Sequence, residues 1–298
     1  MGKLLRDGPE SDALRDAEQH HGEFAVLGVA VVDRVALVFD DVSRGRGSHW
    51  LLFGFTTKLF GVPGATTCMA FSDRLLAEAE PVWAAQYDHP FVTELADGSL
   101  DPDAFRHWVE QDYRYLLDYA DVFSLAATKA SDEARTARLA ETAHRVLADE
   151  LDLHRGFAAD YGLSRADLEA VEKAPTCQAY TDHLVRAARE AGLPTIAAAV
   201  YPCGQGYLDV ADHAADLAAD EHRYTPFVEK YTSDAFRETV AWLRDLVDDL
   251  AEANPGARED MRAAFHRSAR LEHDFWEMAY TREDWSVGPE RAPDATAD

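Results

Sequence analysis

Apolar residues spaced three and four positions apart recur through most of this chain, and this helical spacing limits the fold more than any other feature. Such segments follow one another from residue 72 to residue 280, joined by short polar links, with few convincing strand signals between them. The expected helices are 72–87, 101–129, 132–161, 165–172, 176–191, 193–221, 223–231, 233–253 and 257–280. The expected N-caps are Ser72, Asp101, Ser131, Ser164, Thr176 and Ser233. The pattern predicts an all-α fold, a compact helical bundle.

Three of the expected helices carry an apolar stripe that one reactive side chain interrupts. These side chains are Asp112, Cys203 and Glu272. An unpaired carboxylate is expensive to bury, so each acid needs a partner, a proton or a ligand. If the three interruptions meet, they form an enclosed pocket that can do chemistry, which is the hypothesis that the stripes favour.

The surroundings of Cys203 suit a nucleophile but do not require one. Pro202 removes a backbone donor and is expected to kink the helix, while Gly204 and Gly206 leave room for a flat ligand beside the thiol. A free thiol is mostly protonated at neutral pH, so it needs a neighbouring proton acceptor, for which Glu272 is the candidate. The alternatives stay open, because buried cysteines are usually small apolar residues and buried acids are often satisfied by structural partners.

The composition excludes several classes of partner. The chain of 298 residues has a net charge of -26, from 55 acidic and 29 basic residues, and this opposes binding to nucleic acid or to an anionic membrane. Only five of the basic residues are lysines, a pattern typical of salt-adapted proteins. Three cysteines form neither a disulfide framework nor a closely spaced metal motif, and no secretory signal is evident. We expect a cytoplasmic protein from a high-salt cell.

The balance of acidic and basic residues differs between the first 68 residues and the rest of the chain. Residues 1–68 contain 9 acidic and 7 basic residues, and the remaining 46 and 22 lie in residues 69–298. We interpret residues 1–68 as a non-catalytic N-terminal extension, with the hypothesis that translation starts at Met69. Residues 69–285 form the predicted helical domain, and residues 286–298 a disordered tail.

A metal site is the alternative chemistry. Glu150 and His154 are four residues apart on one helical face, and Asp209 and His213 repeat the spacing. Such pairs could bind iron or manganese in a bundle core, although the doubled Glu-x-x-His motif of ferritin-like sites is missing. We therefore expect Glu150 and His154 to form a buried hydrogen-bonded pair that supports the pocket.

At this point the chain resembles a known family. The segments that carry the resemblance are Asp88-His89-Pro90-Phe91-Val92, Gln111-Asp112-Tyr113-Arg114-Tyr115-Leu116, Glu150-Leu151-Asp152-Leu153-His154, Pro175-Thr176, Ala179-Tyr180-Thr181, Pro202-Cys203 with Tyr207, Lys230-Tyr231 and Glu272-His273-Asp274-Phe275-Trp276. Their order and spacing make residues 69–285 similar to the TenA family, also called thiaminase II or aminopyrimidine aminohydrolase. Met69-Ala70-Phe71-Ser72 also resembles the beginning of family members.

The resemblance implies a heme-oxygenase-like bundle without heme, a homotetramer, and hydrolysis at the methylene attached to a thiamin-type aminopyrimidine. It implies no cofactor and no metal. Cys203 matches the nucleophile of the cysteine-bearing branch, Glu272 the proton-transferring acid, and Asp112 the group that holds the ring. The positions implied to stack on the ring or tune the thiol are Tyr115, Tyr180, Tyr207, Tyr231 and Phe275.

The sequence leaves alternatives open for both the substrate and the function. Many relatives have bulkier residues where this chain has Gly204-Gln205-Gly206, so a wider pocket is expected. The aminomethylpyrimidine breakdown product is the preferred substrate over intact thiamin. The competing functions are a metal-dependent oxidase or oxygenase and a non-catalytic pyrimidine-binding regulatory protein.

Overall fold

The computed structural model describes residues 69–218 and 221–287. Residues 1–68, predicted to form an N-terminal extension, lie outside the described residues, as does most of the predicted tail. The translation start at Met69 stays a prediction. Within the described residues the chain contains helices and no strand, so the all-α prediction is confirmed.

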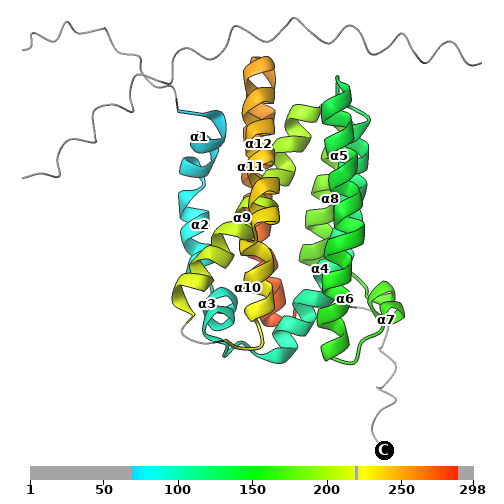
Figure 1. The fold of residues 1–298 in the computed structure, drawn as a ribbon, viewed down its shortest axis with the longest axis vertical. Helices are drawn as coiled ribbons and strands as arrows, with labels where there is room; N and C mark the ends of the chain where they lie inside the picture. The colour runs from blue at the N-terminus through cyan, green and yellow to red at the C-terminus, as the bar shows by residue number, and fades with distance from the viewer. Residues whose placement is uncertain (1–68, 219–220, 288–298) are drawn as a thin grey trace, which may run out of the picture. The chain divides into compact units, whose positions relative to one another are not determined.

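Long helices run side by side along the vertical axis of Figure 1, and shorter ones close the lower end. The first group is α1 (Phe71–Glu78), α2 (Glu80–Tyr87), α3 (Pro90–Asp97), α4 (Pro102–Ala127), α5 (Glu133–Arg145), the π-helical turn η1 (Val146–Glu150), α6 (Leu151–Asp160) and α7 (Arg165–Ala170). The second group is α8 (Pro175–Glu190), α9 (Leu193–Leu217), α10 (Thr225–Thr232), α11 (Asp234–Ala253), the 3-10 turn η2 (Pro255–Ala257) and α12 (Arg258–Thr281).

Two of the expected helices are interrupted, and one observed helix was not expected. The expected helix 72–87 breaks at Ala79 into α1 and α2, because Pro81 cannot supply a backbone donor and instead begins a new helix. The expected helix 132–161 contains the π-helical turn η1. Helix α3 was missed: Pro90 begins it, and the ring of His89 accepts a hydrogen bond from the backbone of Phe91.

Three of the six predicted N-caps are confirmed. Asp101, Ser164 and Ser233 cap α4, α7 and α11 with side-chain hydrogen bonds. Asp132 caps α5 in place of its neighbour Ser131. Two predictions are wrong because the residues lie inside their helices: the hydroxyl of Ser72 donates to Asp248 at 2.7 Å, and the backbone of Thr176 donates to Glu283 at 2.9 Å.

Helix α9 lies at the centre of the bundle. Its N-terminal half, from Leu193 to Pro202, consists of small and apolar residues that are mostly buried, as expected for a helical segment without a polar face. It packs against α12, α11, α10 and α3, and α12 in turn packs against α4 and α8. The stripes that contain Asp112 on α4, Cys203 on α9 and Glu272 on α12 therefore converge.

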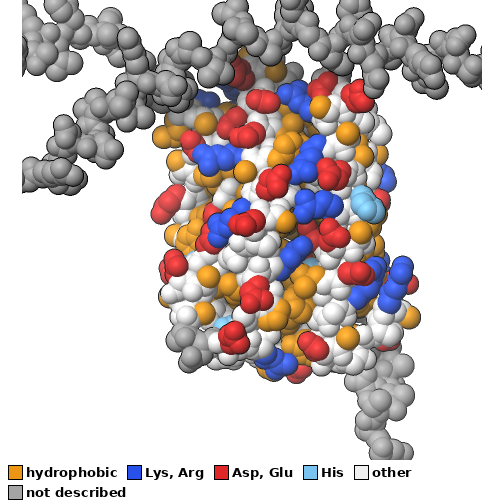
Figure 2. Space-filling model, viewed as in Figure 1, with side chains coloured by type: hydrophobic (Ala, Val, Ile, Leu, Met, Phe, Trp, Pro, Cys, Tyr) orange, Lys and Arg blue, Asp and Glu red, His pale blue; other side chains and the backbone are white. Residues whose placement is uncertain are grey.

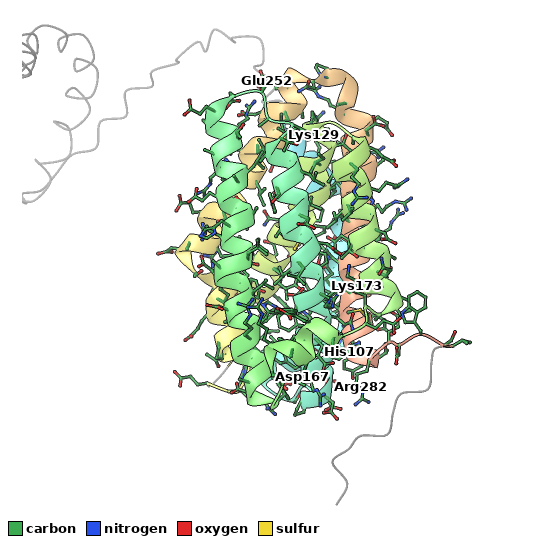
Figure 3. The ribbon with its side chains drawn as sticks, turned by 90° about the vertical axis from the view of Figure 1, so that its right-hand side faces the viewer. His107, Lys129, Asp167, Lys173, Glu252 and Arg282 are labelled. Atoms are coloured by element: carbon green, nitrogen blue, oxygen red, sulfur yellow. The ribbon has the colours of Figure 1, made fainter. Side chains whose placement is uncertain are left out.

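Lys129 and Lys173 link α8 to α4 by hydrogen bonds, one near each end of α8 (Figure 3). Lys129, just after α4, donates to the backbone oxygen of Ala191 at 2.5 Å. Lys173, just before α8, pairs with Asp118 of α4 and donates to Thr181 at 3.1 Å. These links hold α8 alongside α4, which positions the tyrosine of α8 described below.

The surface carries interspersed charge. Figure 2 shows acidic side chains over one face of the bundle with basic side chains between them, separated by apolar patches. Several arginines on this surface lie in ion pairs, such as Arg237 with Asp212 and Arg262 with Glu78. No helix of the described residues is both long and apolar enough to cross a bilayer.

Candidate active site

The three reactive interruptions meet, as the sequence predicts. Asp112 and Cys203 line the same cavity, and the Cys203 thiol lies beside the buried carboxyl group of Glu272, close enough for each to shift the pKa of the other. Asp112 and Glu272 have only 4% and 2% of their surface exposed. Side chains from α4, α9 and α12 therefore form one site.

The cavity is narrow and mostly apolar. It is lined by Asp112, Tyr115, Leu116, Tyr119, Phe123, Thr142, Val146, Glu150, Cys203, Gly204, Tyr207, Tyr231, Phe236, Thr239, Val240 and Leu243. Its volume is about 40 Å³, room for a few water molecules at about 10–15 Å³ each. A pyrimidine ring is larger, so it enters only if lining side chains shift. The wide pocket expected from the glycines is not observed.

Burial dominates the chemistry of the thiol. It raises the pKa of Cys203 well above its usual value, and the nearby charge of Glu272 raises it further. The Tyr115 hydroxyl opposes this shift, although it makes no well-aligned hydrogen bond among the described residues. The resting residue is therefore a neutral thiol, and it reacts only if a neighbouring base takes its proton.

Glu272 can be that base. Burial raises its pKa to about 8, while a hydrogen bond from Tyr180 at 2.5 Å opposes the shift. The charge of Asp112 adds to the increase, and the contact with Cys203 opposes it. A carboxyl group with a pKa near neutrality can both accept and donate a proton at ordinary pH, which is the requirement for general acid-base catalysis.

A hydrogen-bonded chain holds Asp112. Trp108 donates to the Tyr207 hydroxyl at 3.0 Å, and that hydroxyl lies 3.4 Å from Oδ1 of Asp112. Nε2 of His154 lies 2.6 Å from Oδ2 of the same carboxylate. Because the contact to Oδ1 is long, this oxygen is the one that remains able to accept a strong hydrogen bond from a ligand.

The predicted hydrogen bond between Glu150 and His154 is present, but it joins the imidazole to the backbone of Glu150 and not to its carboxylate. Nδ1 of His154 contacts the backbone oxygen of Glu150 at 2.8 Å, and its other nitrogen faces Asp112. The carboxylate of Glu150 points to the cavity instead.

Aromatic rings form the walls on two sides. Tyr115 contacts Tyr180 at 5.0 Å and Phe275 at 5.7 Å between ring centres. The ring centres of Tyr207 and Tyr231, which also line the cavity, lie 4.9 Å apart. These tilted and edge-on contacts hold the rings in fixed orientations around the cavity, where their faces can stack on a ligand once the lining side chains shift.

The sequence predictions divide into lining and supporting residues. Five predicted residues line the cavity: Asp112, Tyr115, Cys203, Tyr207 and Tyr231. The other three, Tyr180, Glu272 and Phe275, lie directly behind it and contact lining residues.

One wall was not predicted at all. It comes from α11 and contains Phe236, Thr239, Val240 and Leu243. Their spacing of three and four on one helical face was a signal in the sequence. It does not distinguish a cavity wall from ordinary core, because both are apolar.

The two glycines beside the thiol have different surroundings. A methyl group added at Gly204 would lie 3.4 Å from Val240 and Leu243, inside the cavity wall. A methyl group at Gly206 would face Gln86 at 3.6 Å, away from the lining residues. Only Gly204 therefore contributes space to the cavity.

The four candidate metal ligands are not brought together. Asp209 accepts hydrogen bonds from Trp83 at 2.9 Å and Gln205 at 2.8 Å, and His213 packs on Tyr87. Neither Asp209 nor His213 lines the cavity that contains Glu150. Over residues 69–218 and 221–287, no group of three or more His, Cys, Asp or Glu could hold a metal ion.

Comparison with known proteins places these residues in a family. The profile of the TENA/THI-4/PQQC family matches residues 76–282. An aminopyrimidine aminohydrolase of Halalkalibacterium halodurans is 35% identical over 221 residues, covering 73% of this chain and 99% of the relative. A protein of the same name from Bacillus subtilis is 33% identical, covering 73% of this chain and 93% of the relative.

Solved structures show the same fold. A TenA homologue from P. horikoshii is 24% identical, with a TM-score of 0.67 over 71% of this chain and 99% of that one. A protein from Silicibacter, described as a TenA family transcription regulator, is 28% identical with a TM-score of 0.67, over 71% and 96% of the two chains. A Shewanella denitrificans domain with a heme oxygenase-like fold is 14% identical with a TM-score of 0.58, over 70% and 91%.

Proposed function

The chain belongs to the TENA/THI-4/PQQC family, and on that premise we propose that it is an aminopyrimidine aminohydrolase of thiamin salvage. It converts 4-amino-5-aminomethyl-2-methylpyrimidine to the 5-hydroxymethyl compound and ammonia, with cleavage of thiamin as a further activity. The relatives with this name are 30–35% identical to the chain over most of its helical domain.

The contact between Cys203 and Glu272 at the cavity wall carries this proposal. A buried thiol is unreactive unless it is paired with a base, and here the base is a carboxyl group whose pKa of about 8 lets it exchange protons. Burying Cys203 and Glu272 together does not stabilise the fold, because the negative charge of either group disfavours the negative charge of the other.

We assign the roles as follows. Oδ1 of Asp112 accepts a hydrogen bond from the ring amino group. Glu272 takes the proton of Cys203 as the sulfur adds to an electrophilic carbon of the ring, and returns it to a ring nitrogen. The bond between the exocyclic methylene and nitrogen then breaks, with its electron pair leaving on nitrogen. Water adds to the methylene and gives one proton to Glu272. The ring nitrogen then loses its proton as the sulfur is expelled and the ring recovers its aromaticity, and Glu272 returns its proton to the sulfur.

The aromatic residues orient the ring in this scheme. Tyr115, Tyr207 and Tyr231 face the cavity and stack on the bound pyrimidine. Tyr180 and Phe275 act from behind: Tyr180 holds Glu272, and Phe275 holds Tyr115. No residue of this scheme requires a metal or a cofactor.

The test is product formation from the aminomethylpyrimidine and from thiamin with wild type, Cys203→Ser and Cys177→Ser. Cys177 is the matched control, because it is a buried free cysteine whose sulfur contacts the backbone of Gln111 at 3.5 Å, outside the cavity. We expect wild type and Cys177→Ser to form hydroxymethylpyrimidine and Cys203→Ser to form none. Pyrimidine binding without turnover by wild type would support a non-catalytic binding protein instead.

The setting of the enzyme is part of the proposal. We infer a cytoplasmic homotetramer adapted to high salt, on the grounds of the family resemblance and the net charge of -26. Light scattering checks the assembly: a mass near four times 33.1 kDa supports it. Activity measured across a KCl series checks the salt adaptation, since added salt screens the repulsion between acidic groups.

A further inference from the structure

One carboxylate in the cavity has no role in this scheme. Glu150 ends the π-helical turn η1 and lines the cavity together with Thr142, Val146 and Thr239. Its backbone oxygen is engaged by His154, which leaves its side chain independent of that contact. Glu150 therefore places a second carboxylate in the same space as Asp112.

The Glu150 carboxylate is not satisfied by the protein. Among the described residues no hydrogen bond and no ion pair within 4 Å joins it to another side chain. Burial raises its pKa, and Lys230, His154 and Arg145 oppose this only through their charges at longer range. The Glu150 residue is half-buried, and a cation bound beside its carboxylate would favour the charged form.

The proposed substrate brings such a cation. The methylene of the aminomethyl compound carries an ammonium group at neutral pH, and in thiamin it carries a thiazolium ring. The pyrimidine ring itself is taken by Asp112, Cys203 and the tyrosines. The rest of the lining is apolar or neutral, apart from Glu150, with Phe236, Val240 and Leu243 as its main components.

We propose that Glu150 is the counter-ion that binds the cationic leaving group of the substrate, and this inference rests on the proposed function. The carboxylate selects the charged substrate over the neutral product. When the carbon–nitrogen bond breaks, nitrogen keeps the electron pair and leaves as a neutral molecule, while the methylene gains a neutral hydroxyl. The pyrimidine product is then uncharged and loses its attraction to Glu150, which favours its release.

The test is the Glu150→Gln variant, which keeps the shape and removes the charge. Asp152→Asn is the matched control, because Asp152 is two residues away, 74% exposed and paired with Arg155. In a Cys203→Ser background, binding of the cationic aminomethylpyrimidine and the neutral hydroxymethylpyrimidine is measured by calorimetry. We expect Glu150→Gln to weaken the cationic ligand about 10-fold or more and the neutral one by less than about twofold. We expect Asp152→Asn to change neither.

In the active enzyme, Glu150→Gln should raise KM for the aminomethyl compound by the same factor, with a smaller change in kcat. Equal weakening of the charged and neutral ligands, or no weakening of either, overturns the counter-ion role. These outcomes are separable from failure of the proposed function, because in that case wild type itself forms no product from either substrate.

Discussion

Nε2 of His154 lies 2.6 Å from Oδ2 of Asp112, and both side chains are almost fully enclosed, with 0% and 5% exposed. The other ring nitrogen faces a backbone oxygen at 2.8 Å, which can only accept a hydrogen bond. Both nitrogens therefore face acceptors, and the ring must carry both protons to satisfy them. Burial disfavours the positive charge of His154, but the contact with Asp112 and the negative charge of that carboxylate outweigh burial and raise the pKa of His154. The contact is an ion pair by distance, since the N–H is not well aligned with the oxygen.

Removal of the His154 imidazole should weaken the binding of the pyrimidine by Asp112. In His154→Ala the buried carboxylate of Asp112 loses the partner that holds it in place, so it is no longer positioned to accept a strong hydrogen bond from the ring amino group. We expect binding of hydroxymethylpyrimidine to weaken about 10-fold or more. The control is His183→Ala, because His183 is also buried but contacts Ser268 outside the cavity. Equal losses in both variants would show a general packing effect.

Replacement of Glu272 by glutamine should stabilise the protein at high pH. Its pKa is about 8 in the folded state and 4.5 as an isolated group. The folded state therefore holds a proton that the unfolded state releases, and the free energy of unfolding falls as pH rises from 4.5 to 8. The slope is about 1.4 kcal/mol per pH unit.

Glutamine keeps an oxygen for the Tyr180 hydroxyl and removes this slope. We expect chemical denaturation to show Glu272→Gln gaining stability over wild type as pH rises through this range. His154 also has a raised pKa in the folded state, so it lowers the free energy of unfolding of both proteins as pH rises. The difference in free energy of unfolding between the two proteins therefore reports Glu272 alone. A constant difference across the range would contradict the shifted pKa.

The helices were predictable because their signals are local. Apolar spacing and caps such as Asp101 and Ser164 depend on neighbours in sequence. Helix α3 was missed because it spans only eight residues, Pro90–Asp97, and is capped by the ring of His89, which is not a usual capping residue. The π-helical turn at Val146–Glu150 leaves no mark in the apolar spacing, since it adds only a small offset to a continuing helix.

The site was only partly predictable for a related reason. Asp112, Cys203 and Glu272 stand out because each replaces an apolar residue in a buried stripe. The pairing of His154 with Asp112 depends on the packing of α6 against α4, and no spacing rule relates residues on different helices. The wall of α11 was missed because apolar residues look the same in a core and in a cavity.

Loss of the Tyr180 hydroxyl should move the pH profile. This hydroxyl donates to Glu272 at 2.5 Å and lowers a pKa that burial has raised to about 8. If Glu272 must accept the thiol proton, kcat/KM of wild type rises with pH through that value. In Tyr180→Phe the carboxylate loses a donor, so the midpoint should move to higher pH. Tyr201→Phe is the control, because its hydroxyl contacts Gln205 at 2.9 Å outside the cavity. An unmoved midpoint would exclude Glu272 as the titrating group.

A single methyl group at Gly204 should narrow the cavity without harming the fold. The added carbon would lie 3.4 Å from Val240 and Leu243, an ordinary contact distance, in space that a ligand otherwise uses. Gly156 of α6 has nothing within 4 Å of the same position and serves as the control. Alanine is the better helix former at both sites, so we expect each variant to gain about 0.5–1 kcal/mol in the free energy of unfolding. Only Gly204→Ala should raise KM, because only its methyl group lies on the path of the ring. An unchanged KM in Gly204→Ala would show that the substrate does not use the space beside Gly204.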